Sequence, residues 1–329
     1  MTVVVKVGTS SITGDAGTID DEAVGRLCDQ VARVRADGRP VIVVTSGAIA
    51  AGLPALALGA ERPGDAVTLQ AASAVGQSRL MAVYDRALAR HGLVGGQVLL
   101  APLDFMNRQQ YLHARNTLSR LLDLGVVPVV NENDAVADDE IRFGDNDRLA
   151  ALVAHLIGAD LLALLTDTPG VLTADPRLDR SASLIEEIVE VDQQLEAVAG
   201  GTGTARGSGG MVSKLAAAKI AAWSGVRVVI ADARRPGVLT DAVAGEGVGT
   251  VVHPRDRRLP SRKLWIAFAV GAAGLIRVDD GARAALLELG SSRLAACVLG
   301  LAAGLAAEWS VAIAGPDGRV FAKGLTRLS

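Results

Sequence analysis

The sequence predicts an α/β protein in which a mainly parallel central sheet lies between layers of helices, together with a smaller, mainly β domain. Short apolar runs rich in Val and Leu alternate with longer amphipathic segments, as in βαβ units whose sheet is covered on both faces. Aromatic residues make up only 3% of the 329 residues, so Val, Leu, Ile and Ala must build the core. Because single cores usually stop growing at about 250–300 residues, we expect two domains.

Charge and cysteine content narrow the classes of partner. The chain is 50% hydrophobic and 21% charged with a formal net charge of −3, a balance that does not favour nucleic acid or anionic membrane. Cys28 and Cys297 form no CxxC pair, which indicates neither a disulfide framework nor a zinc site. No signal peptide precedes the first apolar run, and the apolar stretch 295–307 is shorter than the ~20 residues that a membrane helix requires. We therefore expect a cytoplasmic protein without a membrane partner.

Five apolar runs are predicted to form strands of the sheet. They are residues 3–7, 41–45, 126–131, 161–166 and 226–231. Between the first two runs, apolar residues repeat at helical spacing, which predicts a helix that begins after Asp20 and ends near Gly38. Cys28 falls on the apolar face of that helix and is interpreted as core packing, because free cysteine behaves as a small buried hydrophobe.

The periodicity breaks at residues 253–261 (HPRDRRLPS), which contain two prolines and no apolar repeat. We interpret this stretch as a linker between a first domain of residues 1–252 and a second of residues 262–329. In the second domain the pattern predicts strands at 265–270 and 275–278, a helix at 281–289, and a hairpin around residues 315–318, where Pro and Gly supply the turn dihedrals.

Polar residues that end the apolar runs are candidates for a ligand site, because open parallel sheets bind ligands beyond the carboxyl ends of their strands. Lys6, followed by Gly8 and three hydroxyl residues, suits a phosphate contact. The alternative is an edge strand whose lysine reaches solvent. The second run ends in Thr45-Ser46-Gly47, where Ser46 either helps to hold an anion at the start of a helix or caps that helix.

Two clusters of acid and amide residues lie further along the chain. Residues 131–134 (NEND) end the third run, and residues 144–147 (GDND) open a helical segment. Carboxylates can bind a substrate ammonium group or position lysines and Mg²⁺, and amides can bind carboxylate oxygens. Each cluster alone is better explained as a turn with a helix cap. Together they favour a site for a zwitterionic amino acid.

The fourth run ends in Thr166-Asp167 and leads into a loop that either frames a nucleotide or is an ordinary turn. Residues 200–214 are rich in glycine and hydroxyl groups and precede a helix that begins near Met211, so a glycine-rich cover and a helix carrying Lys214 suit a polyphosphate. Two lysines at opposite ends of a cleft can neutralise the charge on a moving phosphoryl group, while carboxylates place the nucleophile and the metal ion. These features therefore indicate phosphoryl transfer. The motifs GxxxxGK[ST], GxGxxG, GxSxG and HExxH are absent from the sequence, so the P-loop, Rossmann, hydrolase and zincin interpretations lack support.

The segments VVVKVGTSS, VIVVTSGAIAAG, VGQSRLM, VVNENDAV, FGDND, LLTDTPGVLTADP and GSGGMVSKLAAAKIA resemble, in this order, the glutamate 5-kinase family. The resemblance extends from Val3 to about Val252, and the combination of NENDAV, GDND and GGM-x-[ST]-K separates this family from other amino acid kinases. It implies the amino acid kinase fold. It also implies transfer of phosphate from ATP to the γ-carboxylate of L-glutamate, which gives γ-glutamyl phosphate in the first step of proline biosynthesis.

The same resemblance implies a role for each matching residue. Lys6 and Lys214 would contact the ATP phosphates, and Asp147 would hold both lysines, so that these three form the catalytic group. Glutamate would be bound by Ser46, Asn131, Asp134 and Asn146. The nucleotide would lie against Lys6, Gly8, Thr166, Asp167, Ser208, Gly209, Gly210, Met211, Val212, Ser213 and Lys214. Mg²⁺ is expected beside ATP, and no side chain needs to form a covalent intermediate.

Residues 262–327 resemble a PUA domain through RKLWIAFAV, GLIRVDDGARAALLELGSS and FAKGLTRL. Their Lys and Arg residues are scattered, which argues against RNA binding, and we expect a regulatory or packing role. The family further implies a homo-oligomer, either dimer or tetramer, and feedback inhibition by proline. Two alternatives stay open: another amino acid kinase such as N-acetylglutamate kinase, and an RNA-binding protein whose kinase domain is a vestigial scaffold.

Overall fold

A computed structural model describes residues 1–14, 17–58, 63–105, 107–136, 146–177, 179–192, 195–196, 209–255, 272, 274–289, 297–301 and 310–326. The chain forms two compact units, residues 1–258 and residues 259–329. Most of the predicted linker, residues 253–261, lies outside the described residues. The predicted domain limits therefore stay predictions.

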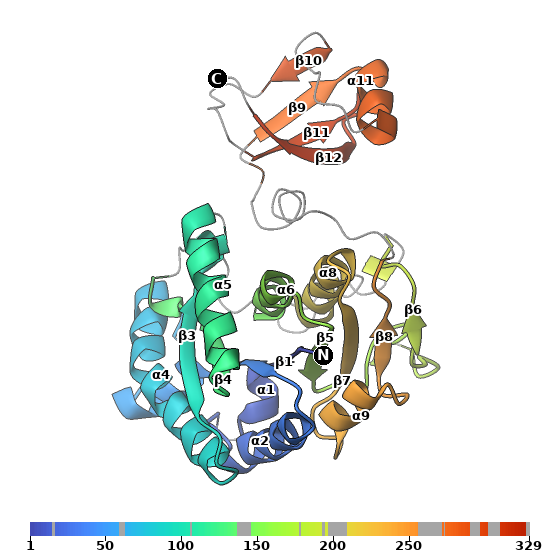
Figure 1. Ribbon diagram of the computed structural model, residues 1–329. Helices are drawn as coiled ribbons and strands as arrows, with labels where there is room; N and C mark the ends of the chain where they lie inside the picture. Colours follow the sequence, from blue (N-terminus) through green and yellow to red (C-terminus); the bar gives the residue numbers. More distant parts are fainter. Residues whose placement is uncertain are drawn as a thin grey trace. The chain divides into compact units, whose positions relative to one another are not determined.

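The first unit is built on a mainly parallel sheet (Figure 1). Its described strands run in the order β3-β4-β2-β1-β5-β7-β8-β6. Neighbouring strands are parallel except for β7 and β8, which are antiparallel. The strands are β1 (Val3–Val7), β2 (Val41–Val44), β3 (Gly95–Leu100), β4 (Val127–Glu132), β5 (Leu161–Thr166), β6 (Glu187–Ile188), β7 (Arg227–Asp232) and β8 (Thr250–Val252). This arrangement confirms the predicted α/β class.

The five predicted strands correspond to β1, β2, β4, β5 and β7, which form the middle of the sheet. The other three strands were not predicted. β3 lies at one edge and begins with two glycines, whereas β8 and β6 lie at the opposite edge and are short. Central strands are buried on both faces and read as continuous apolar runs, while edge strands carry less of that signal.

Helices cover both faces of this sheet (Figure 1). α2 (Asp21–Ala36), α4 (Ala66–Ala89) and α9 (Val238–Ala244) share one core cluster with Val3, Val5 and Val7 of β1. α5 (Arg108–Asp123), α6 (Asn146–Ile157) and α8 (Gly209–Trp223) lie over the opposite face. Shorter elements connect these layers: α1 (Thr9–Ile12), α3 (Ala48–Gly52), η1 (Pro54–Leu56), η2 (Pro102–Phe105) and η3 (Asp134–Val136).

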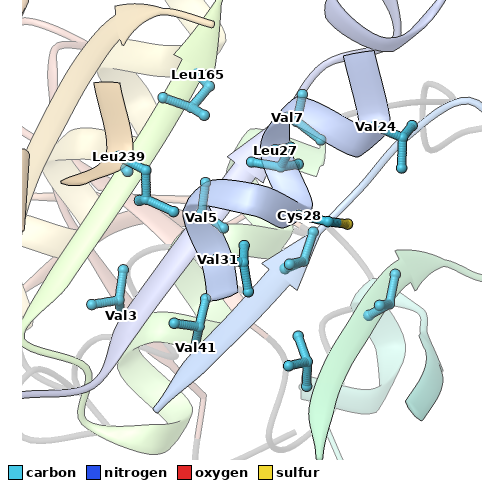
Figure 2. Packing of buried hydrophobic residues seen from close by; sticks show 14 of the residues in the cluster. Val3, Val5, Val7, Val24, Leu27, Cys28, Val31, Val41, Leu165 and Leu239 are labelled. Carbon is cyan, nitrogen blue, oxygen red and sulfur yellow. The ribbon is translucent and has the colours of Figure 1, made fainter. Parts of the chain in front are cut away.

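The sequence of helix α2 explains both where the helix begins and which of its faces packs on the sheet. The helix begins after Asp20, as predicted, and the Asp20 carboxylate caps it by accepting hydrogen bonds from the backbone N–H groups of Glu22 and Ala23 at 2.9 and 3.0 Å. Its apolar face packs on the strands at Val24, Leu27, Cys28 and Val31 (Figure 2). Cys28 is fully buried in this core, which confirms the core-packing prediction, and burial raises the pKa of its thiol to about 12.

Helices α3 and α4 cross with their backbones in contact at two glycines. A Cβ atom on Gly52 would lie 1.9 Å from the carbonyl oxygen of Ala72, and one on Gly76 would lie 1.8 Å from the carbonyl oxygen of Ala48. No side chain fits at such separations. The crossing therefore holds α3 directly against α4 at Ala72 and Gly76.

The second unit contains its own small sheet in the order β10-β9-β11-β12. Its described elements are β9 (Gly274–Val278), α11 (Asp280–Ala284), a π-helical turn (Ala285–Leu289), β10 (Val298–Leu301), β11 (Ser310–Ala314) and β12 (Val320–Leu325). The predicted strand at 275–278, helix at 281–289 and hairpin at 315–318 are confirmed. The predicted strand at 265–270 and most of the apolar stretch 295–307 lie outside the described residues. The separate β sheet is consistent with a PUA-like domain.

Within the described part of the chain, no helix combines the length and the apolar character that a bilayer span requires.

Candidate active site

Lys6 is a buried side chain in a central strand. Val3, Val5 and Val7 of β1 face the core with α2, so the alternation of side chains along a strand directs Lys6 to the opposite face, toward α6 and α8. β1 pairs with β2 on one side and β5 on the other, and Lys6 is only 6% exposed. The alternative of an edge lysine in solvent is therefore wrong.

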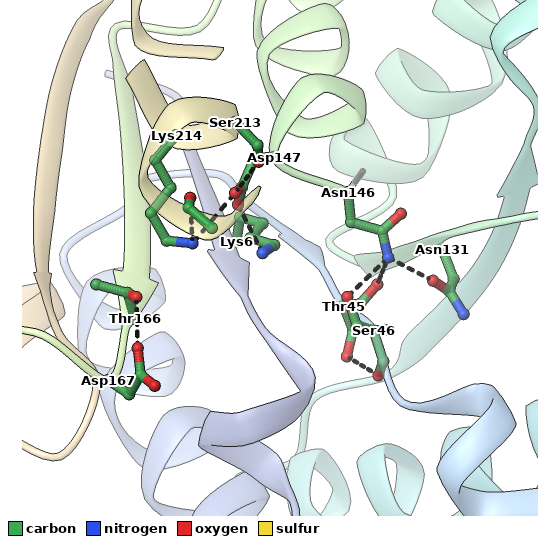
Figure 3. A network of polar contacts seen from close by, with 11 residues as sticks. Lys6, Thr45, Ser46, Asn131, Asn146, Asp147, Thr166, Asp167, Ser213 and Lys214 are labelled. Atoms are coloured by element: carbon green, nitrogen blue, oxygen red, sulfur yellow. Dashed lines mark hydrogen bonds and ion pairs between the residues drawn. The ribbon is translucent and has the colours of Figure 1, made fainter. Parts of the chain in front are cut away.

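Asp147 joins two lysines that are distant in the sequence (Figure 3). Its Oδ1 lies 2.6 Å from Lys6 Nζ, and its Oδ2 lies 3.2 Å from Lys214 Nζ. The Ser213 hydroxyl donates a hydrogen bond to the same Oδ2 at 2.7 Å, and Lys214 Nζ also donates to the carbonyl oxygen of Gly210 at 3.2 Å. Asp147 stands in the first turn of α6, and Lys214 in the second turn of α8. These two helices and β1 thus bring the three charged groups together.

The three charges keep this site ionised and positive. Burial by itself would raise the pKa of Asp147, but the charges of Lys6 and Lys214, with hydrogen bonds from Lys6 and Ser213, hold that pKa below its ordinary value. Two ammonium groups and one carboxylate leave one net positive charge in a buried place, where electrostatic attraction is stronger than in water. Removing such charges from water is unfavourable, so the cluster indicates a functional site and not a device for stability.

Replacing Asp147 with asparagine is expected to lower the free energy of unfolding at pH 7 by about 3–5 kcal/mol, because two buried ammonium groups lose the carboxylate that neutralises part of their charge. The folded-state pKa of Asp147 lies below the ordinary value of 3.8. The contribution of the carboxylate is therefore fully present above that value and is lost as the pH falls through the folded-state pKa. Urea unfolding of both proteins from pH 8 to pH 3 should show the difference narrowing at the acid end. A difference independent of pH would contradict the assigned ion pairs.

The two acid-amide clusters meet at Asn146 (Figure 3). Its Nδ2 donates hydrogen bonds to the carbonyl oxygen of Thr45 at 2.7 Å, to Ser46 Oγ at 2.8 Å and to Asn131 Oδ1 at 3.0 Å. An amide nitrogen carries two protons, so these three acceptors share them. The partners come from the ends of β2 and β4, and Asn146 directly precedes Asp147. The amide network therefore adjoins the lysine cluster.

The structure contradicts the alternative of a cap or turn residue for Ser46, Asn131 and Glu132, whereas Asp134 does open a short turn of helix, η3. Helix α3 begins after Gly47, which has a φ of 100°, and no side chain caps it. Ser46 instead accepts the hydrogen bond from Asn146. Asn131 and Glu132 are buried residues of β4 and not of a turn. Residues 144 and 145 of the second cluster lie outside the described residues.

Helix α4 contributes two polar side chains that the sequence reasoning missed. Ser73 Oγ donates a hydrogen bond to Asp134 Oδ2 at 3.2 Å, and Asn131 Nδ2 donates to Gln77 Oε1 at 2.8 Å. Ser73 and Gln77 stand one turn apart on one face of the helix, and both are buried. Two polar residues at a spacing of four on an otherwise apolar helix face were the signal that could have found them.

The residues predicted to bind the nucleotide lie on the lysine side of the site. Thr166 ends β5, and its hydroxyl donates a hydrogen bond to Asp167 Oδ1 at 3.1 Å (Figure 3). A Cβ atom on Gly8 would lie 3.5 Å from Lys6 Nζ, so the backbone of that loop adjoins the ammonium group. Helix α8 begins at Gly209. Ser208 lies outside the described residues, and the nucleotide contacts of all these residues stay predictions.

Comparison with known proteins identifies the class that this fold and site define. The chain matches the model of the amino acid kinase family over residues 1–232. Isopentenyl phosphate kinase of T. acidophilum, solved as a product complex, shares the fold with a TM-score of 0.54 at 19% identity, over 77% of this chain and 100% of that chain. The chain therefore belongs to the amino acid kinase family.

Relatives with higher sequence identity show to which group of amino acid kinases the chain is similar. A glutamate 5-kinase of Burkholderia multivorans is 46% identical over 327 residues, which is 99% of this chain and 88% of the relative. The glutamate 5-kinase of Pelobacter propionicus is 44% identical over 327 residues, with 99% and 87% covered. These matches confirm the predicted resemblance and place the chain among the glutamate 5-kinases.

Proposed function

We propose that the chain transfers the γ-phosphoryl group of ATP to the γ-carboxylate of L-glutamate, which yields γ-glutamyl phosphate and ADP in the first step of proline biosynthesis. The observation that carries this proposal is the convergence of Lys6 and Lys214 on the buried carboxylate of Asp147, directly beside the amide network of Asn146. A cationic pair beside an acid-amide pocket suits an anionic phosphoryl donor and a zwitterionic acceptor.

In this reaction an oxygen of the γ-carboxylate attacks the γ-phosphorus, and the bond from that phosphorus to the bridging oxygen breaks with its electron pair leaving on ADP. The acceptor is already ionised, so no general base is required. The role that we assign to Asp147 is to position Lys6 and Lys214, whose ammonium groups stabilise the charge on the moving phosphoryl group. The lowered pKa of Asp147 supports this role, because a carboxylate that stays ionised keeps both lysines in place.

We assign glutamate to the side of the site with the amide network and ATP to the side with the lysine cluster. We assign glutamate to Ser46, Asn131, Asp134 and Asn146, with the carboxylate of Asp134 on the ammonium group of the substrate. We assign ATP to Gly8, Thr166, Asp167 and residues 208–214, besides the two lysines. The hydrogen bonds that join Ser46, Asn131 and Asn146 support the first assignment. The position of Thr166 at the carboxyl end of a central strand supports the second.

We propose that Mg²⁺ enters the site together with ATP. Within the described ranges, no group of three or more His, Cys, Asp or Glu side chains could hold a metal ion, and two lysines already engage the carboxylate of Asp147. Protein sites for Mg²⁺ often supply only one or two carboxylates and leave the remaining positions to water and phosphate oxygens. The residues present therefore fit an ion held mainly by the ATP phosphates, where it would neutralise part of their charge.

A coupled assay of ADP release tests the proposed function directly. Glutamate, N-acetylglutamate, aspartate and uridylate are offered in turn with ATP and Mg²⁺, and only glutamate is expected to support turnover. Adding hydroxylamine should trap the acyl phosphate as a hydroxamate. A preference for N-acetylglutamate or uridylate would contradict the assigned acceptor. RNA binding in a filter titration at stated salt, without kinase activity, would favour the scaffold alternative.

Four further properties are proposed from the family resemblance and the composition. They are a homo-oligomeric state, feedback inhibition by proline, a cytoplasmic location, and the division into residues 1–252, 253–261 and 262–329.

A further inference from the structure

Two buried polar atoms beside the proposed acceptor site have no hydrogen-bond partner among the described residues. They are Gln77 Nε2, which is a donor, and Asn146 Oδ1, which is an acceptor. Gln77 is 8% exposed and Asn146 is 3% exposed. Because leaving such groups unpaired is unfavourable, buried polar atoms are nearly always satisfied by protein, water or ligand. The pair therefore indicates that a molecule with both an acceptor and a donor belongs here.

The hydrogen-bond network fixes which end of the Gln77 amide is left over. The backbone N–H of Glu132 donates to Asn131 Oδ1 at 2.9 Å, and Asn146 Nδ2 donates to the same oxygen at 3.0 Å. A backbone N–H is always a donor, so Asn131 must turn its oxygen to Glu132 and its nitrogen to Gln77. Gln77 can accept that hydrogen bond only through Oε1, at 2.8 Å. Its Nε2 is consequently the free donor.

The position of Gln77 indicates which group of the amino acid acceptor its Nε2 would contact. Ser73, one helical turn before Gln77 on α4, holds Asp134, to which we assign the substrate ammonium group. In an α-amino acid the ammonium group and the α-carboxylate are bonded to the same carbon atom. The side-chain carboxylate, in contrast, must extend to the lysine cluster to be phosphorylated. The group within reach of both Asp134 and Gln77 is therefore the α-carboxylate.

We propose that Gln77 is a substrate-binding residue: its Nε2 donates to the α-carboxylate of the amino acid acceptor, while its Oε1 keeps Asn131 in the orientation that Asn146 requires. This inference rests on the proposed function and adds a contact that recognises the end of the substrate remote from the chemistry.

The test compares two ligands in wild type and Gln77→Met, which keeps the length of the side chain and removes the donor. The KM for glutamate is expected to rise on the order of 10-fold, because a charged acceptor loses its partner. The KM for ATP should stay within about twofold. The inhibition constant of 4-aminobutyrate, which has the ammonium group and the reacting carboxylate but no α-carboxylate, should hardly change.

Gln30→Met is the matched control. Gln30 is also buried, and its Oε1 accepts a hydrogen bond from the backbone N–H of Leu239 at 2.8 Å, on the face of the sheet that carries α2 and α9. This variant loses a comparable buried hydrogen bond and should leave the KM for glutamate unchanged. In Gln77→Glu the acceptor for Asn131 remains but an oxygen replaces the donor, so glutamate should bind more weakly than in Gln77→Met. The glutamate-dependent rise in Tm reports this binding even where turnover is too low to measure.

The possible failures are distinguishable. A wild-type protein that releases no ADP with glutamate would refute the proposed function. An active wild type with an unchanged KM for glutamate in Gln77→Met would overturn the present inference alone. Equal losses for glutamate and 4-aminobutyrate would also overturn it, because Gln77 would then act only through Asn131. If Gln77→Met does not fold, Gln77→Glu decides between the same outcomes.

Discussion

Alanine in place of Lys214 is expected to reduce turnover by on the order of 10²–10³-fold, because the lost ammonium group stabilises charge that moves in the transition state. Asp147 holds that group at 3.2 Å from its Oδ2, opposite Lys6 on the other carboxylate oxygen. The measurement is steady-state ADP release at saturating glutamate and ATP. The loss should appear mainly in kcat, since the interaction is weaker in the ground state than in the transition state.

Lys219→Ala provides the control within the same helix. Lys219 lies five residues further along α8 and forms an ion pair with Glu196, with 2.6 Å between Nζ and Oε1, in a partly exposed position. The variant removes the same charge from the same helix but away from Asp147, so it should keep nearly full turnover. Nearly normal turnover in Lys214→Ala, or an equal loss in both variants, would refute the role assigned to Lys214.

Alanine in place of Gly76 should destabilise the first unit by about 3 kcal/mol or more, because the added Cβ overpacks a contact between two backbones. That atom would lie 1.8 Å from the carbonyl oxygen of Ala48 and 2.5 Å from the backbone nitrogen of Gly52. Helix propensity alone would favour alanine by about 1 kcal/mol. A net loss in urea unfolding would therefore report the crossing of α3 and α4 and not the local preference of the chain.

The control for this prediction is Gly247→Ala. A Cβ atom on Gly247 would meet no heavy atom within 4 Å, so the free energy of unfolding should stay within about 0.5 kcal/mol of the wild-type value. If Gly76→Ala instead matched or exceeded the stability of wild type, the close crossing of the two helices would be disproved.

The centre of the fold was predictable because burial on both faces leaves a continuous apolar run in the sequence. β1, β2, β4, β5 and β7 all carry that run, and they occupy the middle of the sheet. β3 opens with Gly95 and Gly96 at an edge, where a strand needs fewer apolar side chains, so its sequence resembles that of a loop. The antiparallel pairing of β8 with β7 depends on how the chain returns to the sheet, which local sequence does not encode.

The candidate site was predictable wherever a polar residue ends a central strand. Parallel strands all have their carboxyl ends at the same edge of the sheet. Lys6, Ser46, Asn131 and Thr166 were therefore expected near that edge. Ser73 and Gln77 escaped this reasoning because they stand in the middle of a helix, where polar residues usually face solvent. Their partners, Asp134 and Asn131, are more than 50 residues away in the sequence, so local sequence does not encode these contacts.

The two lysines of the active site are made at different times during translation of the chain. During translation, the amino-terminal part of a chain is made and can begin to fold first. Lys6 belongs to the first strand, whereas Lys214 arrives only with α8, after the strands β1 to β6 have been made. A nascent or prematurely terminated polypeptide lacking α8 therefore holds one ammonium group where two are needed. Translation products that end before α8 should consequently be inactive as kinases.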